Sequence, residues 1–204
     1  MRIATAAAAL ALVLSSTAFA ASKPLAGVPL QWRPTTEIAE LKIPPIDLVA
    51  FGNTKVKLGA FTEARSGDPA LIGENREDEK KGRVLTVTTK DDVPAFVAQH
   101  LGDLMKNVGL TLADAGATTT VTGEVMEFLV TEVDTYKAQV RLKVTVSDPK
   151  GNALWASIVQ GSSERFGRSY KADNYCEALS DAVLEAGASL LRDPGFLKAA
   201  QGKK

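Results

Sequence analysis

The chain has 204 residues, with 24 basic and 24 acidic side chains, one histidine and one cysteine. The balanced charge creates no overall field that would draw the protein to nucleic acid or to an anionic membrane, so neither is an expected partner. A lone cysteine excludes an internal disulfide, and one histidine with one cysteine argues against a transition-metal site.

Residues 1–20 have the pattern of a secretory signal peptide. Arg2 precedes an almost unbroken apolar stretch from Ile3 to Leu14, and Ala18-Phe19-Ala20 supplies the small residues that signal peptidase reads, with cleavage after Ala20. No later stretch reaches the roughly 18 apolar residues of a spanning helix. No cysteine lies at the end of the apolar stretch, in residues 14–21, so a lipid anchor is not expected. These features predict a periplasmic or secreted protein without a transmembrane segment in the mature chain.

Residues 21–45 are rich in proline, which resists both helix and sheet. We expect an extended arm. Its apolar content is high for a disordered tail, so part of it is expected to lie against the domain or a partner, with Trp32 the residue of greatest interest. The prolines are Pro24, Pro29, Pro34, Pro44 and Pro45.

The first half of the domain is predicted to contain two strand regions and a long polar loop. A strand signal at Leu48–Phe51 leads into Lys55–Ala60, where apolar residues alternate with lysines. The stretch Ser66–Gly82 ends in a run of mixed charge, which is typical of a solvated, mobile loop. The second strand is predicted at Val84–Thr89.

An amphipathic helix follows, and it is the most strongly patterned element of the chain. Apolar residues recur at steps of three and four from Val93 to Val108, and Gly109 supplies the stop. Either Thr89 or Asp91 is predicted to cap its start.

Three strands and a second helix complete the predicted domain. The strand from Thr119 to Val133 changes its apolar phase between Val125 and Phe128, which indicates a bulge. A cleanly alternating strand covers residues 136–146, and Asp148–Gly151 turns the chain into a third strand at residues 153–161. The last helix is predicted to start at Asn174, in a capping box with Glu177, and to end at Asp193-Pro194-Gly195.

The predicted order is β-β-α-β-β-β-α. With one apolar stripe on each helix, both helices are expected on the same face of an antiparallel or mixed sheet, as a two-layer α+β sandwich. The domain is predicted to span residues 46–198, followed by a tail at 199–204.

The sequence offers no recognisable catalytic machinery. The single histidine, His100, lies at the edge of a helical apolar stripe, which favours a structural role over a catalytic one. The acidic stretch 74–79 lacks the alternate spacing of a calcium loop, and no glycine-rich phosphate loop follows a strand. Cys176 is interpreted as a small buried hydrophobe, with a reactive thiol or intermolecular bridge as the alternative. No catalytic residue, cofactor or metal is expected.

Two places stand out as candidate interaction sites. The stretch Ser163–Lys171 carries cations and aromatics between the last strand and the last helix, as a contact surface for a partner would; the alternative is a strand end plus a surface loop. Arg65 could present its side chain to a ligand, although a salt bridge to Glu63 is the alternative use. The candidate interaction residues are Arg65, Arg165, Phe166, Arg168 and Tyr170.

Several short motifs resemble the YajG-type envelope lipoproteins of bacteria, over about residues 45–198. The resemblance implies a periplasm-facing, non-enzymatic envelope domain, built like auxiliary components of transport and assembly systems. The chain departs from that family by lacking the lipidated cysteine and by having Glu63 where the family has aspartate. The motifs are Phe61–Arg65, Ile72-Gly73, the Val-Thr-Thr-x-Asp-Asp start and helix at Val87–Gly109, Gly123–Val125, the hairpin at Asp148–Gly151, and Asn174–Leu191 before Phe196.

The leading hypothesis is an exported, non-enzymatic envelope protein that binds another envelope protein or component. The alternatives are a periplasmic hydrolase that uses carboxylates or calcium, and a small-molecule carrier with a groove between helices and sheet. The oligomeric state stays open.

Overall fold

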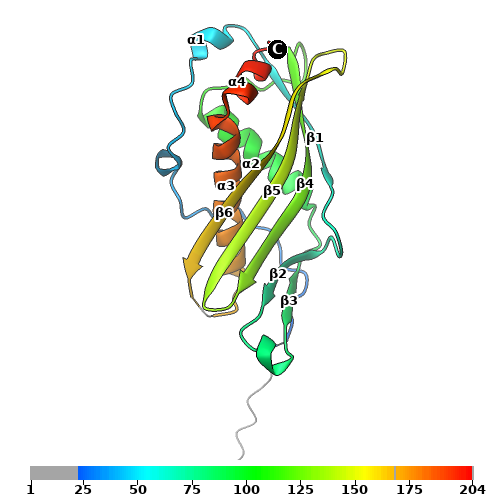
Figure 1. The fold of residues 1–204 in the computed structure, drawn as a ribbon, viewed down its shortest axis with the longest axis vertical. Coiled ribbons are helices and arrows are strands. Elements are labelled where there is room, and N and C mark those ends of the chain that lie inside the picture. Colours follow the sequence, from blue (N-terminus) through cyan, green and yellow to red (C-terminus); the bar gives the residue numbers. More distant parts are fainter. Residues whose placement is uncertain (1–22, 168, 204) are drawn as a thin grey trace, which may run out of the picture.

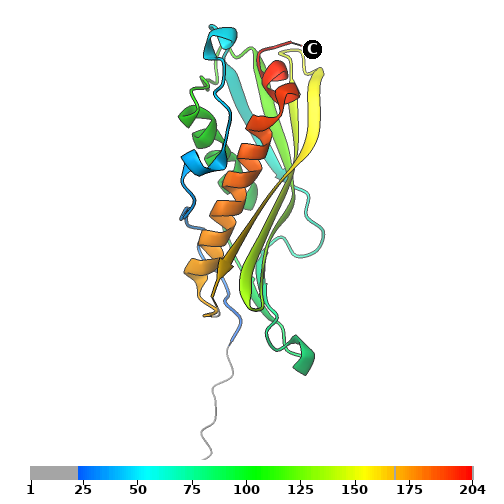
Figure 2. The same ribbon diagram turned by 60° about the vertical axis from the view of Figure 1, so that its left-hand side comes forward.

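A mixed sheet of six strands, with helices on one face, forms the body of the protein in a computed structural model that describes residues 23–167 and 169–203 (Figures 1 and 2). This confirms the predicted two-layer α+β sandwich. The predicted signal peptide lies outside the described residues. The strands are β1 (Val56–Glu63), β2 (Leu71–Asn75), β3 (Leu85–Thr88), β4 (Thr119–Glu132), β5 (Thr135–Ser147) and β6 (Ala153–Phe166). The longer helices are α2 (Val93–Asn107), α3 (Ala172–Arg192) and α4 (Pro194–Ala200).

Strand β4 organises the sheet. It pairs along one side with β5, which pairs with β6, and both pairings are antiparallel. Its other side is shared by two shorter strands, because β1 pairs in parallel with residues 119–125 and β2 with residues 130–132. Strand β3 then pairs antiparallel with β2. The β4–β5 register shifts between Val125 and Glu127, which confirms the bulge predicted from the change of apolar phase.

Two predictions for the first half of the domain were wrong. Leu48–Phe51 is the short helix α1, because Asp47 caps it by accepting the backbone N–H groups of Val49 and Ala50. The predicted loop 66–82 contains β2 and a 3₁₀ turn at Glu79–Lys81. Its charged run is tied together by ion pairs: Arg76 contacts Glu74 and Glu79, and Asp78 contacts Lys81 and Arg83.

The helices carry the predicted apolar stripes but have different caps. Asp92 caps α2 by accepting the Ala95 N–H at 2.9 Å, whereas Asp91 instead accepts the Leu30 N–H of the N-terminal arm. Helix α3 begins at Ala172 without a side-chain cap, so the predicted capping box is wrong. Asn174 and Glu177 already lie inside the helix.

The C-terminal end is more ordered than predicted. After α3, Asp193 accepts the N–H groups of Gly195 and Phe196 and so starts α4, which runs to Ala200. Phe196, Ala199 and Ala200 are buried.

The core lies between the sheet and the helices. The inward side chains of β5, from Tyr136 to Val146, are almost completely buried, and α3 packs over them and over β6. Contact between α3 and β6 is close at Gly161, where a Cβ would overlap the backbone of Ala182 and Ala186. Glycine at this position therefore sets the distance between the helix and the strand.

Residues 23–47 run along the helix layer (Figures 1 and 2). Leu25 pairs in parallel with Val87, along the edge of β3 that faces away from β2. Trp32 stacks on His100 of α2, with ring centroids 3.8 Å apart. Asp181 of α3 accepts the backbone N–H groups of Thr35 and Thr36 and the Thr35 hydroxyl.

Candidate functional site

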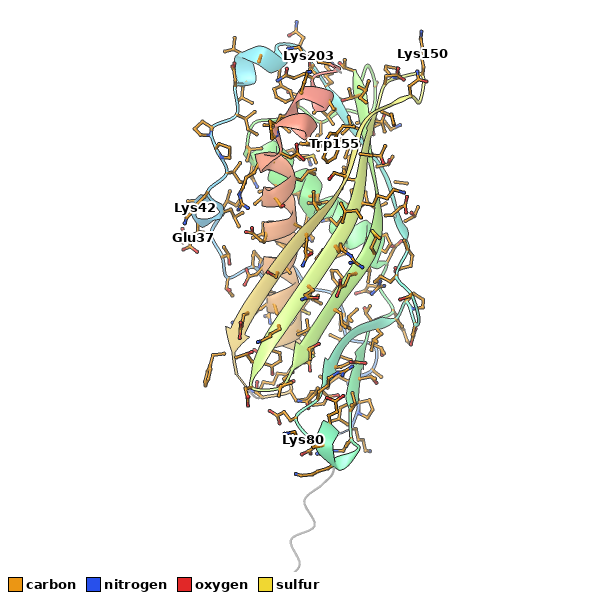
Figure 3. The ribbon with its side chains drawn as sticks, viewed as in Figure 1. Glu37, Lys42, Lys80, Lys150, Trp155 and Lys203 are labelled. Carbon is orange, nitrogen blue, oxygen red and sulfur yellow. The ribbon has the colours of Figure 1, made fainter. Side chains whose placement is uncertain are left out.

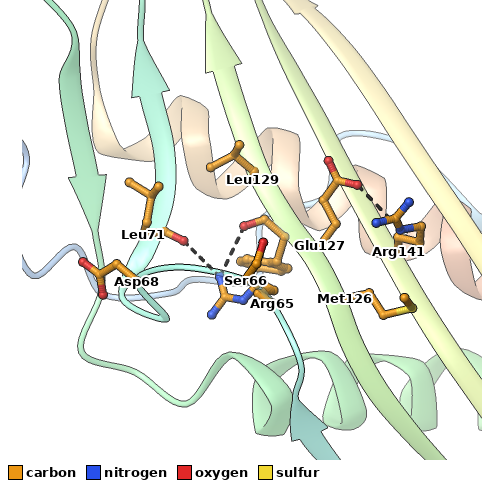
Figure 4. Close-up of a pocket in the computed structure, with 9 residues that line it drawn as sticks. Arg65, Ser66, Asp68, Leu71, Met126, Glu127, Leu129 and Arg141 are labelled. Atoms are coloured by element: carbon orange, nitrogen blue, oxygen red, sulfur yellow. Dashed lines mark hydrogen bonds and ion pairs between the residues drawn. The ribbon is translucent and has the colours of Figure 1, made fainter.

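The edge beside β4 is interrupted where β1 ends and β2 begins. The chain leaves the sheet after Glu63, loops outward and returns at Leu71 in the same direction. A cavity of about 300 Å³ lies at this break (Figure 4). Its lining residues are Arg65, Ser66, Asp68, Leu71, Met126, Glu127, Phe128, Leu129 and Arg141.

Arg65 fills the floor of this break and is only 8% exposed. Its Nε and Nη2 donate to the two Glu63 carboxylate oxygens at 2.8 and 2.5 Å. Its Nη1 donates to the carbonyls of Leu71 at 3.0 Å and Phe128 at 3.4 Å, and Nη2 also reaches the Pro69 carbonyl at 2.6 Å. These contacts engage all the N–H donors that a guanidinium possesses, so none is left for a ligand.

Arg65 therefore has the internal use that was the alternative to ligand binding. It closes the loop between β1 and β2, and it supplies a donor to the Phe128 carbonyl where neither strand pairs with β4. Donation from Arg65 holds the pKa of the Glu63 carboxyl below its ordinary value of 4.5. The Glu63–Arg65 pair thus supplies hydrogen bonds where backbone pairing along this sheet edge is interrupted.

The mouth of the cavity opens toward the sheet face that the helices leave uncovered. Arg141 of β5 lies 3.8 Å from Glu127 of β4 at the rim, and Figure 4 shows Met126 beside them. Ser66 is the hydroxyl of the lining, which contains no histidine or lysine to act as its base.

The segment after β6 is held firmly by internal contacts. Arg165 forms an ion pair with Glu177, and both side chains are about one-quarter exposed, at 27% and 24%. Tyr170 adopts φ 44°, accepts the Leu25 N–H through its hydroxyl and donates that hydroxyl to the Thr86 carbonyl. Burial raises the pKa of Tyr170. Arg168 lies outside the described residues.

Phe166 differs from the other candidates because it is 95% exposed. It ends β6, opposite Thr135 of β5. Because the Arg165–Glu177 pair and the Tyr170 contacts hold the chain on both sides, this exposed ring stands on an anchored segment. Of the described residues predicted for interaction, Phe166 is the one that the structure leaves open to a partner.

Sequence reasoning missed Glu132, which is completely buried at the end of β4. It accepts the Tyr175 hydroxyl at 2.7 Å and the Tyr170 N–H at 3.0 Å. Burial, and then this hydrogen bond, raise the pKa of Tyr175 well above its usual range. The signal was the spacing: Glu132 follows Phe128 and Val130 at two-residue steps on the buried side of the strand.

His100 and Cys176 are both packed into the interior. Burial lowers the pKa of His100, against the opposing effect of Asp103, and its ring lies flat on Trp32. Burial raises the pKa of the Cys176 thiol, which donates to the Pro29 carbonyl at 3.5 Å. Within residues 23–167 and 169–203, no group of three or more histidine, cysteine, aspartate or glutamate side chains could hold a metal ion.

The outer face of the sheet, turned away from the helices, is polar and salt-bridged along β5. Lys143 contacts Glu124 at 2.7 Å, and Lys137 contacts Glu164 at 3.4 Å. Toward β6 this face becomes more apolar, since Ile158 is 54% exposed and Phe166 lies on the same side of the strand.

No protein-family model and no curated protein matches the sequence. Among solved structures, the chain is similar to a Xanthomonas campestris protein of the DUF330 family, with a TM-score of 0.53 and 11% identity, over 83% of this chain and 93% of that one. This likeness shows a shared fold.

Two other solved structures are less similar. A Caulobacter crescentus protein with a provisional lipoprotein assignment has a TM-score of 0.42 and 14% identity, over 54% of this chain and 84% of its own. PelC from Paraburkholderia phytofirmans, solved as a dodecamer, has a TM-score of 0.37 and 14% identity, over 65% of this chain and 86% of its own. None of the three is described as an enzyme. In the part of the chain that the structure describes, no helix has both the length and the apolar character needed to cross a membrane.

Proposed function

We propose that the protein is an exported, non-enzymatic component of the bacterial cell envelope that binds another envelope protein, as an auxiliary part of a transport or assembly system. The contact surface is the outer face of the sheet, here meaning the outward side chains of β4, β5 and β6, with Phe166 at its end. The observation that carries the proposal is the full exposure of an aromatic ring on an anchored strand end.

An exposed phenylalanine on a rigid support is a typical binding anchor. It buries a large apolar area on contact, and little conformational entropy is lost when its neighbours are already fixed. Around it, the outer face supplies lysine, arginine and glutamate pairs of the kind that surround an interface and give it register. A protein surface with one apolar pocket and mixed charge is the complementary partner.

The internal engagement of the reactive side chains supports a non-catalytic role. Arg65 has its donors occupied, His100 is stacked on Trp32, and Cys176 is buried. The apolar start of the sequence, with the pattern of a signal peptide, supports the assignment to the envelope. N-terminal sequencing of the exported protein is expected to begin at Ala21.

A photo-reactive amino acid placed at Gln139, in the middle of the outer face, tests the contact surface in cells. We expect a covalent adduct with another envelope protein. The matched control is the same amino acid at Val49, which is 90% exposed on α1 at the other end of the molecule and should give no such adduct. Equal adducts at both positions would contradict the proposal.

The enzymatic and carrier alternatives are tested separately with the purified mature chain. Turnover of a glycoside or peptide substrate that disappears with a chelator would favour the hydrolase. A bound small molecule retained in native mass spectrometry would favour the carrier. We expect neither result.

A further inference from the structure

Strand β6 is a long edge strand that the fold leaves open. The arm covers β3 through the backbone bonds of Leu25 and Val28, and residues 111–113 bond to the first residue of β1, Val56. Within the described residues, no backbone hydrogen bond joins β6 to any segment other than β5. Every second N–H and C=O of β6 therefore points into solvent.

The sequence of β6 lacks the usual protection of an edge. Exposed edges generally carry lysine, proline or an inward charge, which discourages pairing with another chain. From Ala153 to Ser163 this strand contains no charged residue and no proline. Its register with β5 is regular from Trp155 to Phe166, and the irregularity lies at Leu154, near the start of the strand, so the edge is straight over these residues. The edge is thus suited to accept another strand.

We propose that two copies of this chain pair through β6, antiparallel, about a two-fold axis that passes beside Gln160. Pairing must keep outer-face residues opposite outer-face residues, since a shift by one residue would turn the strand over. With Gln160 opposite its own copy, residues 155–165 pair regularly, and Phe166 of each chain lies just past this pairing, beside the irregularity at Leu154 of the other.

The same register avoids repulsion. Glu164 and Arg165, the charged residues of β6, lie opposite Ala156 and Trp155 of the second copy. In the register centred on Val159, regular pairing would shorten to residues 155–163 and leave Glu164 and Arg165 beside the irregular start of the second strand. Trp155, which Figure 3 labels, packs edge-on against Phe196 of α4, so its position is fixed before the copies meet.

A second copy suits this edge better than an unrelated strand, because the two identical β6 strands fit each other in the register centred on Gln160. A two-fold pairing also uses up both open edges, so it ends at a dimer and does not grow into a fibre. The two outer faces become one continuous surface. The inference rests on β6 alone and does not require the proposed function.

A cysteine at the axis tests the register in the mature chain. Directly opposed residues in an antiparallel pair have Cβ atoms about 4.5–5.5 Å apart, close to what a disulfide needs. Gln160→Cys is expected to form a covalent dimer under mild oxidation. The control, Gln139→Cys, is exposed on the neighbouring strand and should stay monomeric on a non-reducing gel. Cys176 is buried and should not contribute.

Sedimentation completes the test without a cross-link. The unmodified chain is expected to sediment as a dimer, and Ile158→Lys, which adds a guarding charge to the edge, as a folded monomer. A monomeric unmodified chain, equal cross-linking of the two cysteine variants, or a strand of a different protein bonded to the β6 backbone would overturn the proposal. Because none of these changes touches Phe166, failure here leaves the partner adduct at Gln139 to be judged separately.

Discussion

Arg65 shows how one side chain can replace missing backbone pairing. Its contacts to Leu71, Phe128 and Pro69 bridge the gap between β1 and β2, and its pair with Glu63 holds the guanidinium in place. The planar fork of arginine is required, since several acceptors in different directions must be reached at once.

Arg65→Lys is therefore expected to destabilise the protein even though the charge is kept. An ammonium has three donors on a single nitrogen and cannot bridge these acceptors, so we expect a loss of about 2 kcal/mol in the free energy of unfolding. Urea denaturation measures it. Arg141→Lys at the exposed rim is the control and should change stability by about 0.5 kcal/mol or less. Equal effects of the two substitutions would contradict the assigned role.

The lowered pKa of Glu63 predicts a contribution to acid sensitivity. Since the folded-state pKa lies below the ordinary 4.5, the stabilisation is complete above that pH and is lost as the pH falls through the folded value. Glu63→Gln should lower stability at neutral pH and flatten the pH dependence in this acidic range. Urea midpoints from about pH 7 to about pH 3 test this. An unchanged slope in the variant would show that Glu63 does not contribute.

At the scale of elements, the N-terminal arm is the part whose position depends on a few polar contacts. Asp181 is 5% exposed and accepts three hydrogen bonds from Thr35 and Thr36. Hydrogen bonds to a carboxylate are stronger than hydrogen bonds to a neutral acceptor. The arm is thereby fixed to α3.

Asp181→Ala is expected to release the middle of the arm while the sheet and helices stay folded. Amide exchange at Thr35 and Thr36 should rise by about tenfold or more, because hydrogen bonds to a charged group are worth about 1.5–3 kcal/mol. The control is Asp173→Ala on the same helix, whose 63% exposed carboxylate pairs with Arg33 at the surface. If both variants exchange alike, Asp181 does not fix the arm.

Elements with a sustained period were predictable from the sequence, and short ones were not. Helix α2, the stripe of α3 and the strands β4 to β6 follow repeats long enough to identify. Leu48–Phe51 is too short to distinguish a helix from a strand, and Leu71–Asn75 is a short strand interrupted by Gly73 within a polar region. The caps at Asp92 and Asp193 were missed because several acidic residues could serve, and only the tertiary structure selects one.

For the whole molecule, the α+β class followed from the stripe on each helix and the alternating face of β5. The candidate site was only partly predictable. The sequence marks Phe166 as unusual, but its exposure depends on where β6 ends and on how Tyr170 is anchored. Arg65 is buried instead, because it donates to the nearby carbonyls of Pro69 and Leu71 and to the distant carbonyl of Phe128, which no local pattern reveals.

The partner contact at Phe166 is the central claim, and its removal is the most direct test. Phe166 is expected to become buried when the partner binds, and loss of such an anchor costs about 2 kcal/mol of binding free energy. Phe166→Ala should therefore weaken partner binding by about 30-fold and reduce the adduct formed from Gln139 accordingly. Val49→Ala, an equally exposed apolar position, should leave the adduct unchanged. An adduct from Gln139 that persists at full yield in Phe166→Ala would contradict the account.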